Sequence, residues 1–409
     1  MANATKTYEY SVRDRTGKMV TGKLDAANEA ALVSKLRTMG YAPVSVREAG
    51  TGMNKEITIP GLGGNSVKLK DLAIMSRQFA TMINSGLSLL RALSILAEQT
   101  ESRALAKTLD EVRNDVEGGL SLSAAMAKHQ NVFPPLMVNM CRAGEVGGFL
   151  DTVLLRIAAN YEAEVKLRSK IKSAMTYPVA VLVMAVLAVF GMLIFIVPIF
   201  KQMFEDLGGT LPAPTRVLVF LSEQMAWVAP LVLVLAVVSG VVWKRIKNEE
   251  RVLNVVDPLK LKTPVFGPLF QKIAISRFAR NLGTMVRSGV PILQALDIVA
   301  ETTGNVVIGR AVRDVQNSVR SGESLAGPLA NHAVFPPMVV QMLAVGEDTG
   351  AIDTMLEKIS EFYDQEVEAT TESLTALLEP LMIGLLGGVI ASMIIALYMP
   401  MFKIFENIN

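Results

Sequence analysis

The sequence is poor in the residues that carry most enzymatic and metal chemistry. It has one cysteine, Cys141, and two histidines, His129 and His332, among 409 residues. One cysteine cannot form an internal disulfide, and these three residues do not supply the ligands of an ordinary zinc site. Cys141 lies in an apolar stretch, which favours a small buried side chain over a reactive thiol. We expect structural or solvated roles for the two histidines.

Several signature motifs are missing as well. No G-x-x-x-x-G-K-[ST] phosphate loop is present, which argues against ATP hydrolysis by that mechanism. The net charge of the chain is only +2, whereas nucleic acid binding requires a concentrated basic face. We therefore expect no nucleic acid partner. The opening residues, M-A-N-A-T-K-T-Y-E-Y, have no apolar core typical of a signal peptide. We therefore expect the N-terminus to stay in the cytosol.

Apolar residues, in contrast, make up 51% of the chain. Three uncharged runs are long enough to cross a bilayer, which takes about 20 residues. They lie between Lys172 and Lys201, between Glu223 and Lys244, and between Glu379 and Lys403. Transport pathways and proton relays usually need charged groups inside such spans. Their absence from these runs counts against a pump or channel.

Basic residues near the ends of the first two runs predict the orientation. Four precede the first run and four follow the second: Lys166, Arg168, Lys170, Lys172, Lys244, Arg245, Lys247 and Arg251. The loop between the runs carries only Lys201 and Arg216. By the positive-inside rule, this loop lies outside and the large domains lie in the cytosol.

One long segment occurs twice in the chain. V-F-P-P-L-M-V-N-M-C-R-A-G-E begins at Val132, and V-F-P-P-M-V-V-Q-M-L-A-V-G-E begins at Val334. Phe133 and Phe335 are 202 residues apart (335 − 133), and this offset continues into the first and third apolar runs. A repeat of this length is one domain used twice. Because each copy ends in a span, the second span is the connector that brings the chain back to the cytosolic side.

Each copy is predicted to be a bundle of helices. Apolar residues recur at three- and four-residue intervals over 72–96 and 278–299, with Ser-Gly breaks at Ser85 and Ser288. The Phe-Pro-Pro motif is expected to open a further helix, since proline is tolerated in a first turn. The following Gly-Glu is expected to end it, with Gly144 or Gly346 as the cap.

The fold class predicted is a mainly α membrane protein with two repeated cytosolic helical-bundle domains, three transmembrane helices and a small N-terminal α/β unit. Alternating residues and turn signals predict that unit as β-β-α-β, followed by a Gly-rich linker. The predicted divisions are 1–50 for the small unit, 51–67 for the linker, 68–172 for the first helical domain, 174–200 for the first transmembrane helix, 201–223 for an external loop, 224–243 for the second transmembrane helix, 244–379 for the second helical domain, 380–402 for the third transmembrane helix and 403–409 for an external tail.

Charge is inverted between the copies just before the spans. At the offset of 202, Lys166 corresponds to Glu368 and Lys170 to Glu372. We hypothesise that these helices face each other and pair, either within one chain or between neighbouring chains. The alternative is two independent solvated faces, because exposed ion pairs contribute little.

A second set of charged residues follows the repeated glycines. Glu145 and Glu347, with Asp151 and Asp353, could bind a cation at an interface. The competing interpretation is that they cap helices or form salt bridges. No resident metal and no cofactor is predicted from these residues.

These motifs together resemble the type II secretion F / type IV pilus inner-membrane platform family, called GspF or PilC. The resemblance covers nearly the whole chain. It includes Y-E-Y-x-x-x-D-x-x-G-K-x-x-x-G from Tyr8, R-Q-F-A-T-M-I-N-S-G-L-S-L-L-R-A-L, F-P-P-L-M-V-N-M-C-R-A-G-E-V-G-G-F-L-D, Tyr177-Pro178 and the P-x-F-K at the outer end of the first span.

The resemblance implies a non-enzymatic platform protein in the bacterial cytoplasmic (inner) membrane. Such a protein contacts a cytosolic hexameric assembly ATPase, in some systems also a retraction ATPase, and moves pilin or pseudopilin subunits into a filament. Other inner-membrane assembly proteins, the lipid bilayer and further copies of the chain are the remaining implied partners. We expect the motor contact at the helix ends around Gly144-Glu145 and Gly346-Glu347. Four glycines within the spans would permit close helix approach: Gly191, Gly384, Gly387 and Gly388.

Three alternatives remain open at this point. Within the family, the filament could be a type II secretion pseudopilus rather than a pilus. From another class, the chain could be a membrane transporter subunit, which solute flux without a motor would favour. A membrane enzyme is the third, and turnover by the purified protein would favour it.

Overall fold

The structure is a computed structural model that describes residues 6–13, 19–26, 29–38, 42–48, 67–206, 211–247 and 249–408. The chain divides into two units, residues 1–65 and 66–409. Apart from Val67, the predicted linker lies outside the described residues.

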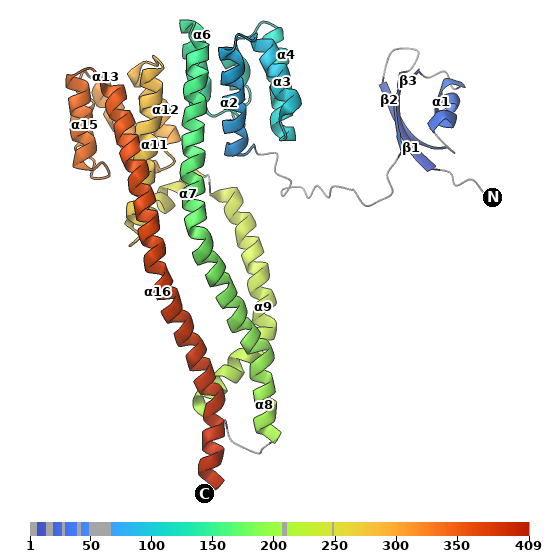
Figure 1. The fold of residues 1–409 in the computed structure, drawn as a ribbon, viewed down its shortest axis with the longest axis vertical. Helices are drawn as coiled ribbons and strands as arrows, with labels where there is room; N and C mark the ends of the chain where they lie inside the picture. The colour runs from blue at the N-terminus through green and yellow to red at the C-terminus, as the bar shows by residue number, and fades with distance from the viewer. Residues whose placement is uncertain are drawn as a thin grey trace. The chain divides into compact units, whose positions relative to one another are not determined.

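The first unit is a small antiparallel sheet with one helix (Figure 1). The central strand β1 (Lys6–Arg13) pairs with β2 (Met19–Ala26) on one side and with β3 (Ala42–Glu48) on the other. Helix α1 (Glu29–Thr38) lies between β2 and β3 in sequence and buries Leu32 and Leu36. Their spacing of four residues puts both leucines on one helix face.

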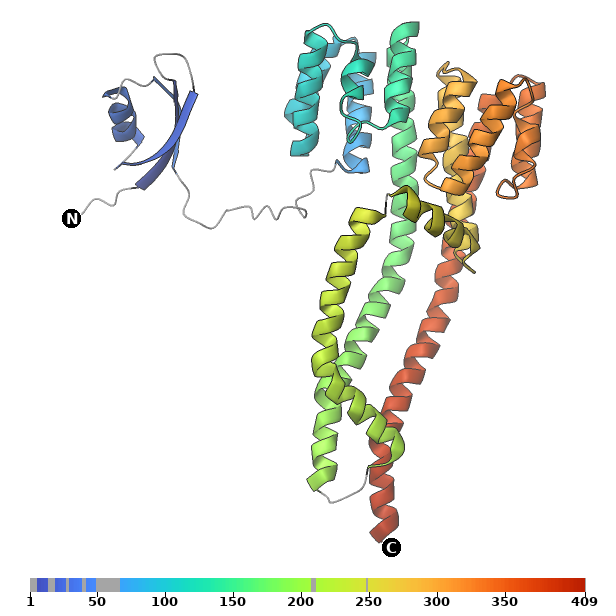
Figure 2. The same ribbon diagram turned by 180° about the vertical axis from the view of Figure 1, so that it is seen from behind.

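The second unit contains two sets of six helices in the same order (Figures 1 and 2). The first set is α2 (Leu69–Asn84), α3 (Leu89–Gln99), α4 (Arg103–Glu117), α5 (Leu122–Ala127), α6 (Pro135–Gly147) and α7 (Leu150–Gly191). The second set is α11 (Gly267–Arg287), α12 (Ile292–Thr302), α13 (Val306–Arg320), α14 (Ala326–Leu329), α15 (Pro337–Asp348) and α16 (Ile352–Ile408). Between them lie α8 (Val197–Asp206), α9 (Ala213–Ile246) and α10 (Glu250–Lys262). The predicted helical repeat is thus confirmed, and the Ser-Gly breaks fall where α2 and α11 end.

The Phe-Pro-Pro motif has the same role in both copies. Phe133 and Phe335 are buried in one continuous apolar core that includes residues of both sets. The second proline of each motif, Pro135 or Pro337, is the first residue of α6 or α15. A proline at this position sacrifices no helical hydrogen bond, because the first amide groups of a helix have no partner within it.

The predicted helix caps at Gly144 and Gly346 are wrong. Helix α6 continues to Gly147, and Gly148 caps it with a left-handed φ of 74°. In the second copy, Gly350 has the left-handed backbone, with a φ of 70°. Gly144 and Gly346 lie inside the helices for a different reason: an added Cβ would be 3.1 Å from the Cα of Leu150 or Ile352. They allow the next helix to cross closely.

In the part of the chain that the structure describes, three helical stretches are long and apolar enough to cross a membrane: Leu150–Asp206, Trp227–Ile246 and Ile352–Phe402. The first runs from α7 through the π-helical turn η1 (Met192–Ile196) into α8. In both copies the last helix of the bundle and the span are one continuous helix, so the predicted boundary at 172–174 is no structural break. Much of the predicted external loop is also helical, in α8 and the start of α9, and α16 extends to Ile408 through most of the predicted tail.

The distal ends of the spans pack on one another. Leu193, Val197, Val219, Met393 and Leu397 form a buried cluster between η1, α8, α9 and α16. Two buried hydroxyl groups at this end donate hydrogen bonds to backbone carbonyls of neighbouring spans, from Thr215 to Ala396 and from Ser222 to Leu193. The second bond uses a carbonyl within the π-helical turn, where the regular hydrogen-bond pattern of the helix is interrupted.

Candidate functional site

The repeated glutamates cap short helices in both copies. The carboxylate of Glu145 accepts hydrogen bonds from the backbone amides of Leu122 and Ser123, which begin α5. Glu347 accepts from Leu325 at 2.8 Å and from Ala326 at 3.2 Å, at the start of α14. Amide groups at a helix start lack partners within the helix and favour a negative charge. The geometry therefore matches the capping interpretation.

The cation interpretation of these acidic residues finds no structural support. Asp353 pairs with Arg287 at 3.3 Å. Across the described ranges, no group of three or more histidine, cysteine, aspartate or glutamate side chains is placed to hold a metal ion. The histidines occupy equivalent places, with His129 3.7 Å from Glu111 and His332 3.7 Å from Asp314.

The corners after α6 and α15 combine buried and exposed residues. Gly144 and Gly346 are buried, so neither can form a contact surface directly. Beside them, the side chain of Val146 is 87% exposed and that of Val345 is 53% exposed. Cys141, one turn before Gly144, is fully buried, and burial raises the pKa of its thiol. That environment suits the predicted small core side chain.

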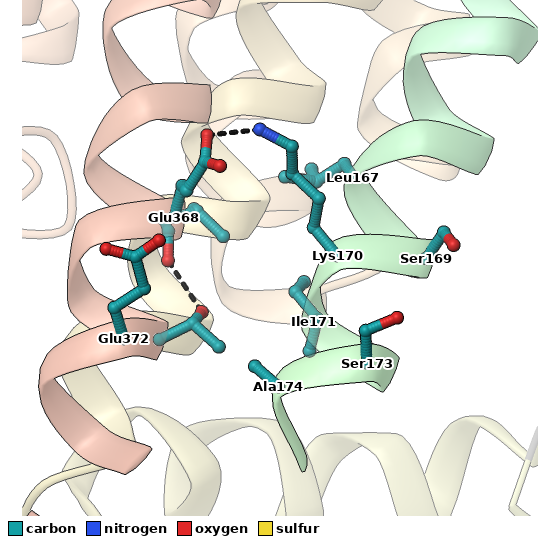
Figure 3. Close-up of a pocket in the computed structure, with 10 residues that line it drawn as sticks. Leu167, Ser169, Lys170, Ile171, Ser173, Ala174, Glu368 and Glu372 are labelled. Atoms are coloured by element: carbon teal, nitrogen blue, oxygen red, sulfur yellow. Dashed lines mark hydrogen bonds and ion pairs between the residues drawn. The ribbon is translucent and has the colours of Figure 1, made fainter. Parts of the chain in front are cut away.

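The hypothesis of inter-helix charge pairing involves four residues on α7 and α16. Lys170 of α7 and Glu368 of α16 form an ion pair within the chain (Figure 3). Glu372 lines a cavity of about 250 Å³ between the same helices, below this pair. Lys166 lies one turn before Lys170 on the same side of α7 and lines a groove against α2, which Lys170 also borders. The structure thus pairs Lys170 with Glu368, and among the described residues it shows no ion pair for Lys166 or Glu372.

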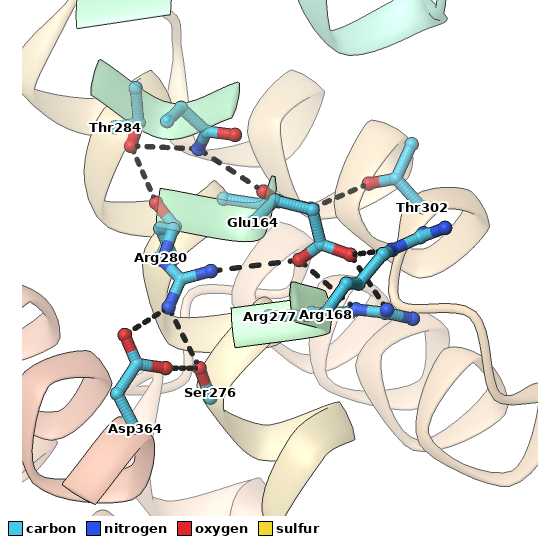
Figure 4. Close-up of polar contacts among 10 residues, drawn as sticks. Glu164, Arg168, Ser276, Arg277, Arg280, Thr284, Thr302 and Asp364 are labelled. Carbon is cyan, nitrogen blue, oxygen red and sulfur yellow. Dashed lines mark hydrogen bonds and ion pairs between the residues drawn. The ribbon is translucent and has the colours of Figure 1, made fainter. Parts of the chain in front are cut away.

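A polar cluster that the sequence analysis did not identify joins the two copies (Figure 4). Glu164 of α7 is central to it, with a side chain only 13% exposed. Its carboxylate is 2.8 Å from Arg168 of the same helix and 2.6 Å from Arg277 of α11. Burial opposes ionisation of Glu164, but the two guanidinium groups outweigh it and lower the pKa of the carboxyl group. The charged carboxylate therefore binds the two copies together.

The cluster extends to α16 through Arg280, which is buried in α11. Its guanidinium group pairs with Asp364, and it lies 3.6 Å from Glu164 on its other side. Ser276 donates a hydrogen bond to Asp364 at 2.5 Å. Breaking one partner of a buried ion pair costs about 3–5 kcal/mol, so this cluster fixes the relative position of α7, α11 and α16.

One ion pair recurs in both copies and explains part of this arrangement. Arg77 of α2 holds Glu162 of α7 through two hydrogen bonds of 2.7 and 2.5 Å. Arg280 and Asp364 are the equivalent residues of the second copy, at offsets of 203 (280 − 77) and 202 (364 − 162). The first pair is 42% and 43% exposed, whereas the second is 9% and 32% exposed, with Arg280 next to Glu164 of α7. The sequence shows the matching positions of the two pairs, but it does not show which pair is shielded from solvent.

The four span glycines make no close contact within the chain. A Cβ added to Gly191, Gly384, Gly387 or Gly388 would meet no atom within 4 Å. Among the described residues, no other span of this chain therefore approaches these glycines, and close approach by a helix of another chain stays a prediction. The spans approach one another at their distal ends, through larger apolar side chains.

Comparison with known proteins matches the repeat. A family model described as type II secretion system (T2SS), protein F fits this chain twice, over residues 75–198 and 278–400. A model described as type II secretion system protein F, N-terminal domain fits residues 1–47. The two longer matches coincide with the two copies and confirm the internal repeat.

Individual relatives cover nearly the full length. The type IV pilus assembly protein PilC of Myxococcus xanthus (strain DK1622) is 43% identical over 405 residues, which is 98% of this chain and 95% of the relative. The protein of the same name from Thermus thermophilus is 43% identical over 403 residues, 98% of this chain and 99% of the relative. The type II secretion system protein F of Xanthomonas campestris pv. campestris is 33% identical over 401 residues, 96% of this chain and 98% of the relative.

Proposed function

The chain belongs to the family of type II secretion system protein F, and we propose that it is the non-enzymatic platform protein of a type IV pilus assembly machine in the bacterial cytoplasmic membrane. The observation that carries this proposal is 43% identity over nearly the whole chain to two proteins named type IV pilus assembly protein PilC. In this role the protein couples a cytosolic hexameric ATPase to the insertion of pilin subunits into the filament.

The orientation proposed places both helical bundles and the N-terminus in the cytosol. Basic residues flank the first two spans on the side of the bundles, whereas the opposite side carries only Lys201 and Arg216 between them. Basic residues are retained on the cytoplasmic side of a membrane. A cytosolic ATPase would then meet the bundles, and pilin helices would meet the spans.

The continuity of α7 and α16 supports a mechanical role. Each helix leaves its bundle and enters the apolar run without interruption. The buried ion pairs of Glu164 and Arg280 hold the two long helices in one arrangement at the level of the bundles. A displacement of the bundles by a motor would therefore be transmitted to the spans rather than absorbed by a flexible joint.

For the motor contact we propose the corners after α6 and α15. Gly144, Glu145, Gly346 and Glu347 shape these corners by close packing and by capping, as described above. Val146 and Val345 project beside them and offer apolar contact area.

Co-purification of the full-length protein in detergent with its assembly ATPase, with and without nucleotide, tests the proposal. A nucleotide-dependent complex that Val146→Asp weakens is expected. Val255→Asp, at a 68% exposed position of α10, is the control with a similarly exposed valine and should leave the complex intact. Absence of any complex in every nucleotide state would contradict the motor-platform role.

The second candidate within the family is the platform of a type II secretion pseudopilus, which relatives of 33% identity or less favour. The two roles predict different defects in a strain that lacks this protein. Loss of surface pili with normal secretion of extracellular enzymes supports the pilus, and the reverse supports the pseudopilus.

A further inference from the structure

An open groove lies between α2 and α7, next to the first span. It has a volume of about 520 Å³. Apolar side chains, Ala73, Ile74 and Val165, contribute to its lining, and Ile74 is 48% exposed. Lys70 and Lys166 line it as well. The groove therefore combines an apolar surface with two cationic groups.

The charges of this groove are not balanced. Arg77 and Glu162, which also line it, neutralise each other through their paired hydrogen bonds. Lys170 is paired with Glu368. Among the described residues, Lys70 and Lys166 have no acidic partner, so the groove carries two uncompensated positive charges.

The end of the groove nearer the first span lies within side-chain reach of the expected head-group layer. Lys172 is the last charged residue before the apolar run of the first span. With a rise of 1.5 Å per residue, Lys166 lies about 9 Å above it along α7. The head-group layer on each side of a bilayer is roughly 5–7 Å thick, and a lysine side chain extends several ångströms toward it.

The second copy shows that this feature is specific to the first. At the positions of Lys70, Lys166 and Lys170 it has Ile273, Glu368 and Glu372. There Leu167 of α7 packs with Leu269, Val367 and Leu374 and covers the equivalent surface. In the second copy α7 therefore covers the equivalent surface, whereas in the first copy the groove is open and basic.

We propose that the groove between α2 and α7 binds the head group of an anionic phospholipid of the surrounding membrane. The phosphate lies between Lys70 and Lys166, and the glycerol and upper acyl chain contact Ile74 and Val165. Basic pockets beside transmembrane helices are suited to anionic head groups. This inference is independent of the proposed function, since it requires neither a motor nor pilin.

The test uses native mass spectrometry of the full-length protein in mild detergent, titrated with dioleoylphosphatidylglycerol or dioleoylphosphatidylcholine. We expect retention of the anionic lipid and weaker retention of the zwitterionic one. Each lysine near an anionic lipid contributes about 1 kcal/mol, or about fivefold in affinity. Lys70→Gln/Lys166→Gln should therefore lower the affinity for phosphatidylglycerol by roughly 25-fold.

Two further variants make the result specific. Lys244→Gln/Lys247→Gln removes two lysines that border the second span at the end of α9 and should leave retention nearly unchanged. Lys70→Arg/Lys166→Arg keeps the charge and should retain the lipid. An unchanged thermal unfolding midpoint without lipid shows that each variant is folded.

Several results would overturn the proposal. Equal losses in the groove variant and the α9 variant would show general attraction to the membrane. Equal retention of the zwitterionic lipid, or displacement by equimolar glycerol 3-phosphate, would exclude a lipid head-group site. In a further such result, Lys70→Gln/Lys166→Gln retains phosphatidylglycerol while the mass of a dimer disappears from its spectrum. That result would show that a second copy of this chain occupies the groove.

Discussion

At the scale of single residues, two glutamates of α7 have different energetic weight. Arg77 and Glu162 form an exposed pair, for which the expected contribution is below about 1 kcal/mol. Glu164, which follows two residues later on α7, is buried between the copies. Solvent access, rather than residue type, separates the two carboxylates.

Glu164→Gln should destabilise the bundles in a pH-dependent way. The folded pKa of Glu164 is lowered, so its stabilisation is complete above the unfolded value of about 4.5 and is lost as pH falls through the folded pKa. We expect the free energy of unfolding of the variant to be about 3 kcal/mol lower than that of the unmodified protein at pH 7. The difference from the unmodified protein should narrow below pH 4.5, which thermal unfolding between pH 7 and pH 3 measures.

Glu162→Gln is the control for this prediction. It removes a carboxylate of the same helix, but the exposed pair should contribute less than about 1 kcal/mol at pH 7. Equal destabilisation by both variants would show that the cluster around Glu164 does not hold the copies together.

At the scale of elements, the contacts between consecutive helices decide which glycines matter. Gly144 lies where α6 crosses the start of α7, and an added Cβ would be 3.1 Å from both Leu150 and Val153. Gly384 lies in the apolar part of α16 with no atom within 4 Å of the same position. Both look alike in the sequence, since each is a glycine within an apolar helix.

Gly144→Ala should therefore destabilise the first bundle by about 1–3 kcal/mol, because the added methyl group pushes α6 and α7 apart. Gly384→Ala fills open space and should be neutral, or stabilising by up to about 1 kcal/mol. Thermal unfolding in detergent compares the two. If Gly384→Ala proved the more damaging, the glycines of α16 would have a neighbour that belongs to another chain.

At the scale of the whole molecule, the two long helices define the mechanical connection. Helix α7, continued by η1 and α8, begins in a bundle and extends beyond the apolar run, as α16 does in the second copy. Bundles attached by flexible loops could be displaced without moving the spans. Continuous helices do not permit this, since their hydrogen bonds extend through the boundary.

Insertion of Gly-Gly-Ser between Lys172 and Ser173 should uncouple the bundles from the first span. We expect loss of pilus assembly, with the ATPase still co-purifying, because the bundle itself is unchanged. The same insertion after Gly119, in the turn between α4 and α5, is the control and should preserve assembly. Normal pili in the strain with the α7 insertion would contradict transmission through the helix.

The sequence by itself determined the repeat, the three spans and the helix start at each Phe-Pro-Pro, because these depend on local spacing and on long apolar runs. It could not assign the role of the glycine in the Gly-Glu motif, because a helix cap and a close crossing of two helices both favour glycine. Nor could it show that Lys170 pairs with Glu368 while Lys166 does not, because both lie on one side of α7 and only the packing of α16 decides which of them it meets. Only the tertiary structure decided which copy of the repeated Arg–acid pair is covered. That depends on how two nearly equivalent surfaces dock, and docking brings together residues more than a hundred positions apart.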